Sequence, residues 1–216
     1  ELSTKPENAM GDEKIWQNAE GALKKALEKK KIKFKINAGE GAFYGPKIDF
    51  HIKDSLGRTW QCATVQVDFM QPENFDLHYV STDGKQHRPV IIHRVVYGSL
   101  ERFLGILVEH YQGKFPAWLS PVQVMILPIS DENSEYAETV LKKLKGTGLR
   151  VGIDRESSTL QYKIRNAQMQ KVPYMLIVGK KEEENKTVAV RTRDGKVNYG
   201  VKLDDFVEAL RKEILN

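Results

Sequence analysis

Residues 91–103 read IIHRVVYGSLERF, and this stretch decides how the rest of the chain is interpreted. Its apolar first half predicts a strand, and the residues from Gly98 onward predict a helix that ends near Tyr111. His93 and Arg94 interrupt a strand that otherwise reads as buried. Side chains alternate between the two faces of a strand, so these two point in opposite directions. Each needs a partner if it is buried, and for Arg94 we expect a structural ion pair.

Two explanations remain open for His93 and for Arg102. A lone histidine on an apolar strand is more often hydrogen-bonded and structural than a ligand of a metal or substrate. Arg102 lies one turn into the helix, behind Gly98 and Ser99, whose backbone N–H groups would favour an anion. Its guanidinium could grip a phosphate or lie on a purine ring, or it could form a surface pair with a neighbouring glutamate.

The residues before this stretch predict one helix followed by an antiparallel meander of strands. Asp12 is placed to cap a helix over residues 13–31, and 47–54 and 59–69 alternate like half-buried strands. Shorter strands are expected at 33–36 and 75–80. Strict alternation over 59–69 puts Gln61 and Gln66 on opposite faces.

The segment GEGAFYGPK, residues 39–47, is rich in glycine and has two explanations. A plain hairpin turn is the simpler one. The other is a loop whose backbone approaches a ligand closely, with Tyr44 and Lys47 beside it. The spacing matches neither of the known phosphate-loop patterns.

The residues after this stretch change in pattern. Residues 113–121, GKFPAWLSP, contain two prolines and a glycine and predict a linker. From residue 122 to 216, apolar strands alternate with helices, which predicts a small α/β domain with a largely parallel sheet; KKEEEN, 180–185, is expected to be a turn. The predicted fold class is therefore α/β overall, an α+β antiparallel-sheet domain over 1–112 followed by this smaller one.

The composition restricts the location and the binding partners that we expect of the protein. The chain has 216 residues, 40% of them hydrophobic, and a net charge of +5 that permits contact with nucleic acid without demanding it. No apolar run approaches the roughly 20 residues that span a bilayer, and no secretory signal is visible, so we expect a cytoplasmic protein with no membrane contact. A single cysteine, Cys62, excludes a disulfide framework.

Six motifs stand in order along essentially the whole chain: GEGAFYGPKIDF, WQCATVQVDF, PVIIHRVVYGSLERF, FPAWLSPVQV, VPYMLIVGKKE and VAVRTR. Together they resemble the threonyl-tRNA synthetase family of class IIa, and GSLERF is similar to motif 3 of the class II synthetases. The resemblance implies the second part of a class II catalytic domain followed by an anticodon-binding domain. Motifs 1 and 2 have no counterpart here, so we expect a C-terminal fragment that is not active alone.

The resemblance also implies the reaction and its residues. Threonine would be activated by ATP, with Mg²⁺, to threonyl-adenylate and transferred to tRNA(Thr). Arg102 and Lys47 would be the catalytic residues, with Arg102 packed on the adenine and reaching the triphosphate. Gly98 and Ser99 would line the ATP site. The pocket for threonine and the adenylate would be lined by Tyr44, Gln61, Thr64 and Gln66.

Two further sites follow from the resemblance. His93 matches a ligand of a zinc ion, which would separate threonine from valine by binding the hydroxyl group; the remaining ligands are expected outside this chain. In the second domain, Lys171, Glu182 and Arg191 match positions that contact the anticodon. The complete protein would be a homodimer.

Two other hypotheses remain. One is a non-catalytic synthetase-like module that binds tRNA or another RNA, and the other is a class IIa synthetase for a different amino acid. Tyr44, His93 and Arg102 favour the enzyme, because a module freed from catalysis has no chemical need for them.

Overall fold

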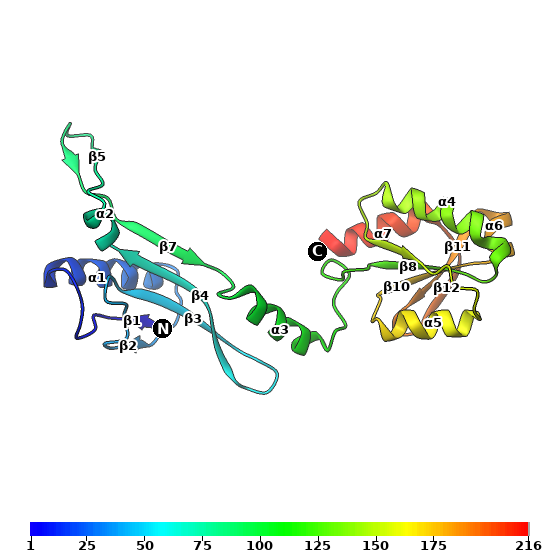
Figure 1. The fold of residues 1–216 in the computed structure, drawn as a ribbon, viewed down its shortest axis with the longest axis horizontal. Coiled ribbons are helices and arrows are strands. Elements are labelled where there is room, and N and C mark those ends of the chain that lie inside the picture. The colour runs from blue at the N-terminus through cyan, green and yellow to red at the C-terminus, as the bar shows by residue number, and fades with distance from the viewer. Residues whose placement is uncertain (216) are drawn as a thin grey trace. The chain divides into compact units, whose positions relative to one another are not determined.

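The chain folds as two compact units. The computed structural model describes residues 1–215; the first unit ends at His110 and the second begins at Tyr111 (Figure 1). Within the described residues, every helix is too short or too polar to span a bilayer.

The first unit is a five-stranded sheet with one long helix on one face. The strand order is β2-β1-β3-β4-β7, and neighbouring strands are antiparallel except β1 and β2. The elements of the sheet and its helix are β1 (Leu2–Ser3), α1 (Glu13–Lys29), β2 (Ile36–Asn37), β3 (Lys47–Lys53), β4 (Thr59–Asp68) and β7 (Ile91–Val95). Asp12 caps α1, as predicted, by accepting from the backbone N–H of Ile15 at 2.9 Å. The core lies between α1 and the sheet and consists of Leu2, Trp16, Leu23, Leu27, Ile48, Val67 and Phe69.

A β-bulge in β4 overturns the predicted facing of Gln61. Phe50 pairs with Ala63 but His51 pairs with Gln61, so Cys62 is an extra residue in the ladder. Because an extra residue resets the two-residue alternation, Gln61 lies on the same face as Thr64 and Gln66. The prediction that Gln61 and Gln66 face opposite ways is therefore wrong.

β7 is exposed, which corrects the expectation of a buried strand. Among the described residues it is the edge strand of the sheet and pairs only with β4. Its residues from Ile92 to Val95 are exposed, and Ile92 retains 61% of its surface. Arg94 takes part in no ion pair between described residues, so the predicted structural ion pair is wrong too.

The remaining elements of the first unit connect and follow the sheet. A short hairpin pairs β5 with β6, and the predicted strand over 75–80 is reduced to its last two residues. The predicted strand over 33–36 likewise shrinks to β2 at its end. The elements are α2 (Met70–Asn74), β5 (Tyr79–Val80), β6 (Gln86–His87) and α3 (Leu100–Tyr111).

The second unit is a sheet covered on both faces. Its order is β12-β11-β10-β8-β9, in which β10, β8 and β9 are parallel and the β11–β12 hairpin is antiparallel. Helices α4 and α7 pack on one face and α5 on the other (Figure 1). The elements are β8 (Val124–Pro128), a 3₁₀ turn η1 (Asp131–Asn133), α4 (Ser134–Lys145), β9 (Val151–Ile153), α5 (Leu160–Met169), β10 (Tyr174–Val178), α6 (Lys180–Asn185), β11 (Thr187–Thr192), β12 (Val197–Lys202) and α7 (Leu203–Leu215).

Two segments of the second unit are more ordered than their composition suggests. The segment 113–121 contributes to the core of the second unit through Ala117, which is only 2% exposed. The expected turn 180–185 is helix α6, and Glu182 accepts from the backbone N–H of Gly179 at 3.1 Å. A glutamate three residues after a helix cap stabilises a first turn in this way.

Candidate functional site

The face of the first sheet opposite α1 carries a row of polar side chains. Residues paired directly across antiparallel strands share a face, and the ladders pair Lys47 with Gln66, Asp49 with Thr64, and Gln66 with His93. Through the bulge, Gln61 joins them. We call this surface the polar face; its members are Lys47, Asp49, Gln61, Thr64, Gln66, Asp68 and His93.

Asp49 organises the centre of the polar face. Its carboxylate accepts from Gln61 Nε2 at 2.6 Å and Thr64 Oγ1 at 2.8 Å, and it pairs with Lys47 Nζ at 2.9 Å. Its side chain is only 5% exposed, so these partners replace water around a buried carboxylate. The arrangement holds three of the predicted site residues in fixed orientations, although Asp49 itself was not predicted from the sequence.

The glycine-rich loop places Tyr44 over the same face. Tyr44 OH donates to Gln66 Oε1 at 3.0 Å. A Cβ added to Gly45 would lie 1.7 Å from the carbonyl oxygen of Val67, so only glycine lets the loop lie this close to β4. Val67 N in turn donates to the carbonyl of Pro46 at 3.0 Å. The glycines therefore serve the close approach of loop to strand, which supports both explanations offered by the sequence: a turn, and a turn that positions Tyr44.

His93 lies at one end of the polar face, in a pocket of about 290 Å³ that Tyr44, Asp68 and α2 also line. Its Nε2 lies 2.9 Å from Asp68 Oδ2. The Asp68 side chain is 2% exposed, whereas that of His93 is 42% exposed. The histidine is thus hydrogen-bonded, as the structural explanation requires, while its ring still opens into the pocket.

The fit of a metal ion at His93 is only partial. Histidines that bind metals commonly engage a carboxylate through their other ring nitrogen, as His93 engages Asp68. However, within residues 1–215 no group of three His, Cys, Asp or Glu side chains could hold a metal ion. Closed protein zinc sites need more donors than this, so the described residues do not form a zinc site by themselves.

Arg102 stands on the first turn of α3. Its backbone N–H donates to Ser99 Oγ at 3.3 Å, and its guanidinium carbon lies 5.5 Å from the ring centre of Trp60. The surface pair with a glutamate, one of the two alternatives for Arg102, does not form: Glu109 binds Arg58, and Glu101 accepts from Ser99.

Gly98 is fixed by packing before α3. It has φ +71°, and an added Cβ would lie 2.9 Å from the carbonyl oxygen of Cys62 at the bulge. A side chain here would be strained and would collide with β4. Gly98 thus seats the start of α3 against the bulged strand that carries Gln61.

The turn between β3 and β4 is built around Asp54, whose side chain is fully buried. Burial alone would raise the pKa of this carboxyl. Hydrogen bonds from Trp60 Nε1, from the side chain and backbone of Arg58 and from the backbone of Leu56 outweigh burial and lower the pKa to about 2.

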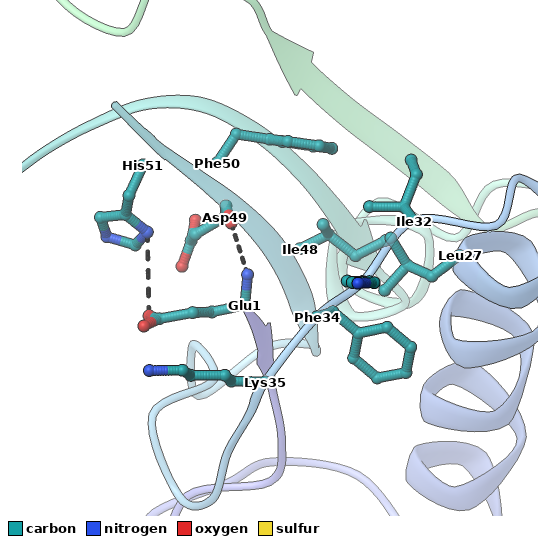
Figure 2. A pocket seen from close by; sticks show the side chains of 10 residues that line it. Glu1, Leu27, Ile32, Phe34, Lys35, Ile48, Asp49, Phe50 and His51 are labelled. Atoms are coloured by element: carbon teal, nitrogen blue, oxygen red, sulfur yellow. Dashed lines mark hydrogen bonds and ion pairs between the residues drawn. The ribbon is translucent and has the colours of Figure 1, made fainter. Parts of the chain in front are cut away.

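A cavity of about 350 Å³ lies elsewhere in the first unit, between α1 and the start of β3 (Figure 2). His51 Nδ1 lies 3.8 Å from Glu1 Oε2. The Glu1 amino group donates to the backbone oxygen of Asp49. Its apolar wall, with Leu27 and Ile48, is part of the unit's core. None of the predicted site residues lines it.

In the second unit, the three predicted anticodon residues are distributed around β10. Lys171 precedes the strand in a left-handed conformation, with φ 59°, and Arg191 on β11 pairs with Met175 near the same end. Glu182 follows the other end of β10, on α6. Arg191 Nε is buried and has no hydrogen-bond partner within the described residues. The register therefore groups Lys171 with Arg191 and sets Glu182 apart.

Comparisons with known proteins match both units. The family model for the tRNA synthetase class II core domain (G, H, P, S and T) covers residues 5–111, and the anticodon binding domain model covers residues 123–213. Over 216 residues the chain is 56% identical to threonine–tRNA ligase of Thermotoga petrophila, and over 217 residues it is 58% identical to that of Acetivibrio thermocellus. The chain belongs to the threonyl-tRNA synthetase family.

Solved structures agree with this assignment. The RNA-binding domain of threonyl-tRNA synthetase from Cryptosporidium parvum matches with a TM-score of 0.91 and 41% identity, over 98% of this chain and 54% of that one. Prolyl-tRNA synthetase from the same organism matches at a TM-score of 0.60 and 21% identity, over 79% of this chain and 36% of that one, which shows a shared fold. All of this chain aligns to the two ligases, but it spans only about a third, 34%, of their length.

Proposed function

We propose that the chain is part of an enzyme that activates threonine with ATP and transfers it to tRNA(Thr). The observation that carries the proposal is the polar face: Lys47, Gln61, Thr64 and Gln66 project from neighbouring strands, with Tyr44 above Gln66. A set of amide, hydroxyl and ammonium groups oriented by a buried carboxylate suits a small zwitterion next to a nucleotide.

Each group has a task that follows from its chemistry. The hydroxyl and amide groups of Tyr44, Thr64 and Gln66 can hydrogen-bond an amino acid. The charges of Lys47 and Arg102 can stabilise phosphate oxygens as adenylate forms, and a guanidinium can also lie on the adenine ring. The Asp49–Lys47 pair fixes the ammonium before any substrate arrives, so less ordering is needed on binding.

The metal sites and the assembly are proposals for the complete protein. His93, held by Asp68, is the candidate zinc ligand of this chain, and further ligands would have to join it. Mg²⁺ would accompany ATP and contact its phosphates. Cytoplasmic location and a homodimer remain predictions of the family resemblance.

We also propose that the second unit binds the anticodon of tRNA(Thr) through Lys171, Glu182 and Arg191. Support comes from Arg191, whose Nε is buried without a partner among the described residues, a costly arrangement that a bound base or phosphate would relieve. Glu182 already caps α6 with one carboxylate oxygen, so its other oxygen would have to accept the hydrogen bond from the base edge. A non-catalytic RNA-binding module would share this unit but would not need the polar face.

Tyr44→Phe in the full-length synthetase that carries these residues tests the enzyme proposal. Removing the phenolic oxygen leaves Gln66 without its 3.0 Å partner, so we expect the KM for threonine in ATP–pyrophosphate exchange to rise about five- to tenfold, the size of one hydrogen bond. Tyr199→Phe is the matched control, because Tyr199 lies 77% exposed on β12. Full exchange activity with Tyr44→Phe, or none in the unaltered protein, would reject the assignment.

A further inference from the structure

In the β3–β4 turn, the carboxylate of Asp54 holds the side chain of Trp60 within a network of hydrogen bonds. Asp54 accepts from Trp60 Nε1 at 2.8 Å and from Arg58 Nε at 2.5 Å. It also accepts from the backbone N–H groups of Leu56 and Arg58, both at 2.9 Å. The carboxylate is fully buried, so each of these bonds is made away from water, and together they fix the indole of Trp60.

The same arrangement is tied to α3 by a second bridge. Arg58 Nη2 reaches Glu109 on α3, at 3.1 Å from Oε1 and 2.9 Å from Oε2. A guanidinium that binds one carboxylate on the turn and another on the helix restrains both elements. Trp60 is thus held relative to the helix whose first turn carries Arg102.

The Arg102 guanidinium lies over this indole. Its guanidinium carbon lies 5.5 Å from the centre of the Trp60 ring, within the distance at which a cation is attracted to a π-face. Among the described residues, that ring is the only side-chain partner recorded for the guanidinium. A long, exposed arginine otherwise loses much rotational freedom when it binds a ligand, and a ring that already restrains it reduces that cost.

We propose that Trp60, anchored by Asp54, is a positioning residue that orients the Arg102 guanidinium for ATP. The inference rests on the proposed role of Arg102 as the nucleotide contact. Trp60 acts through Arg102 and needs no contact with the substrate. If Trp60 served only the stability of the turn, its removal would lower the unfolding temperature without any coupling to Arg102.

A double-mutant cycle separates these roles. The full-length synthetase is compared with Trp60→Leu, Arg102→Ala and the double variant in threonine-dependent ATP–pyrophosphate exchange. We expect Trp60→Leu to raise the KM for ATP about three- to tenfold, the range of a cation–π contact, and to leave the KM for threonine within twofold. Because the effect passes through Arg102, the double variant should be no worse than Arg102→Ala alone.

Three further variants complete the design. Trp60→Phe keeps an aromatic face without the N–H and should recover most of the ATP affinity. Trp60→Met replaces Trp60→Leu if the latter does not fold, since methionine also lacks a π-face and fits irregular spaces. Trp118→Leu, the same substitution at a 54% exposed tryptophan of the second unit, should leave both KM values unchanged.

The outcomes distinguish the inference from the proposed function. If Arg102→Ala weakens ATP binding but the Trp60 effect is absent or fully additive, Trp60 does not position Arg102, and the nucleotide role of Arg102 stands. If Arg102→Ala leaves the KM for ATP unchanged, the proposed nucleotide contact fails, and the positioning role fails with it.

Discussion

Gly45→Ala should unfold the first unit at much lower denaturant, because the new methyl group has no room. The added Cβ would lie 1.7 Å from the Val67 carbonyl oxygen and 2.8 Å from its carbon, whereas real Cβ atoms essentially never come within 3.0 Å of another atom. Loop and strand would have to separate by about 1.3 Å, the difference between 3.0 and 1.7 Å. The obstacle is backbone, so no side chain can rotate away.

The magnitude follows from two contributions. Overpacking at a rigid contact costs about 3 kcal/mol, and the bond from Val67 N to the Pro46 carbonyl, 3.0 Å long, is worth about 1 kcal/mol. The free energy of unfolding should therefore fall by about 4 kcal/mol, a large part of the roughly 5–15 kcal/mol that a domain has. With a urea slope of about 1–2 kcal/mol/M, the midpoint should fall by about 2–4 M.

The assay is urea unfolding of the 216-residue chain, followed by circular dichroism and tryptophan fluorescence. Gly21→Ala is the matched control: Gly21 lies inside α1 with nothing within 4 Å of an added Cβ, so alanine should stabilise the unit by up to about 1 kcal/mol. If Gly45→Ala has the same midpoint as the unaltered chain, the tight seat of the loop against β4, and with it the placement of Tyr44, is wrong.

Two more predictions concern buried polar groups, one in each unit. The pKa of Asp54 lies below its unfolded value, so its stabilising effect is complete above about pH 4 and is lost as the pH falls toward 2. The urea midpoint of the first unit should therefore fall more steeply between pH 5 and 2 in the unaltered chain than in Asp54→Asn. An equal dependence of the midpoint on pH in both proteins would contradict the lowered pKa of Asp54. In the second unit, Gln123 is 2% exposed, and it donates to the Ala117 carbonyl and accepts from Arg150 N, both at 2.9 Å. Gln123→Ala should cost about 1–3 kcal/mol of unfolding free energy, whereas the exposed Gln161→Ala should cost almost nothing, and equal costs would refute the role of this contact.

The helices and strands could be predicted from the sequence better than the strand register and the solvent exposure of each strand. The cap at Asp12, the meander and the second α/β domain follow from local signals that the structure confirms. The β4 bulge did not follow, because alternation assumes an unbroken ladder and Cys62 carries no side-chain signal for an insertion. The exposure of β7 was missed because an apolar run reads the same on an edge strand as in a sheet interior.

Residues that orient others were the hardest to foresee. Asp49, Asp54 and Asp68 each bind a candidate site residue or its neighbour, yet an isolated aspartate in a strand or turn has many explanations. Their roles emerged only once the register was known. A usable signal did exist for Asp49, which shares strand parity with Lys47 and faces Thr64 across the hairpin.

The most direct test of the central claim is the binding of this chain to tRNA(Thr) transcripts, unaltered and with the last two anticodon bases changed. The measurement is made at low and moderate salt, because binding through basic charge alone weakens steeply as salt rises. Arg191→Ala and the exposed Arg165→Ala provide a matched pair of variants. We expect a preference for the unaltered anticodon that persists at moderate salt and is lost with Arg191→Ala. Binding that ignores the anticodon, or that both variants weaken equally, would contradict it.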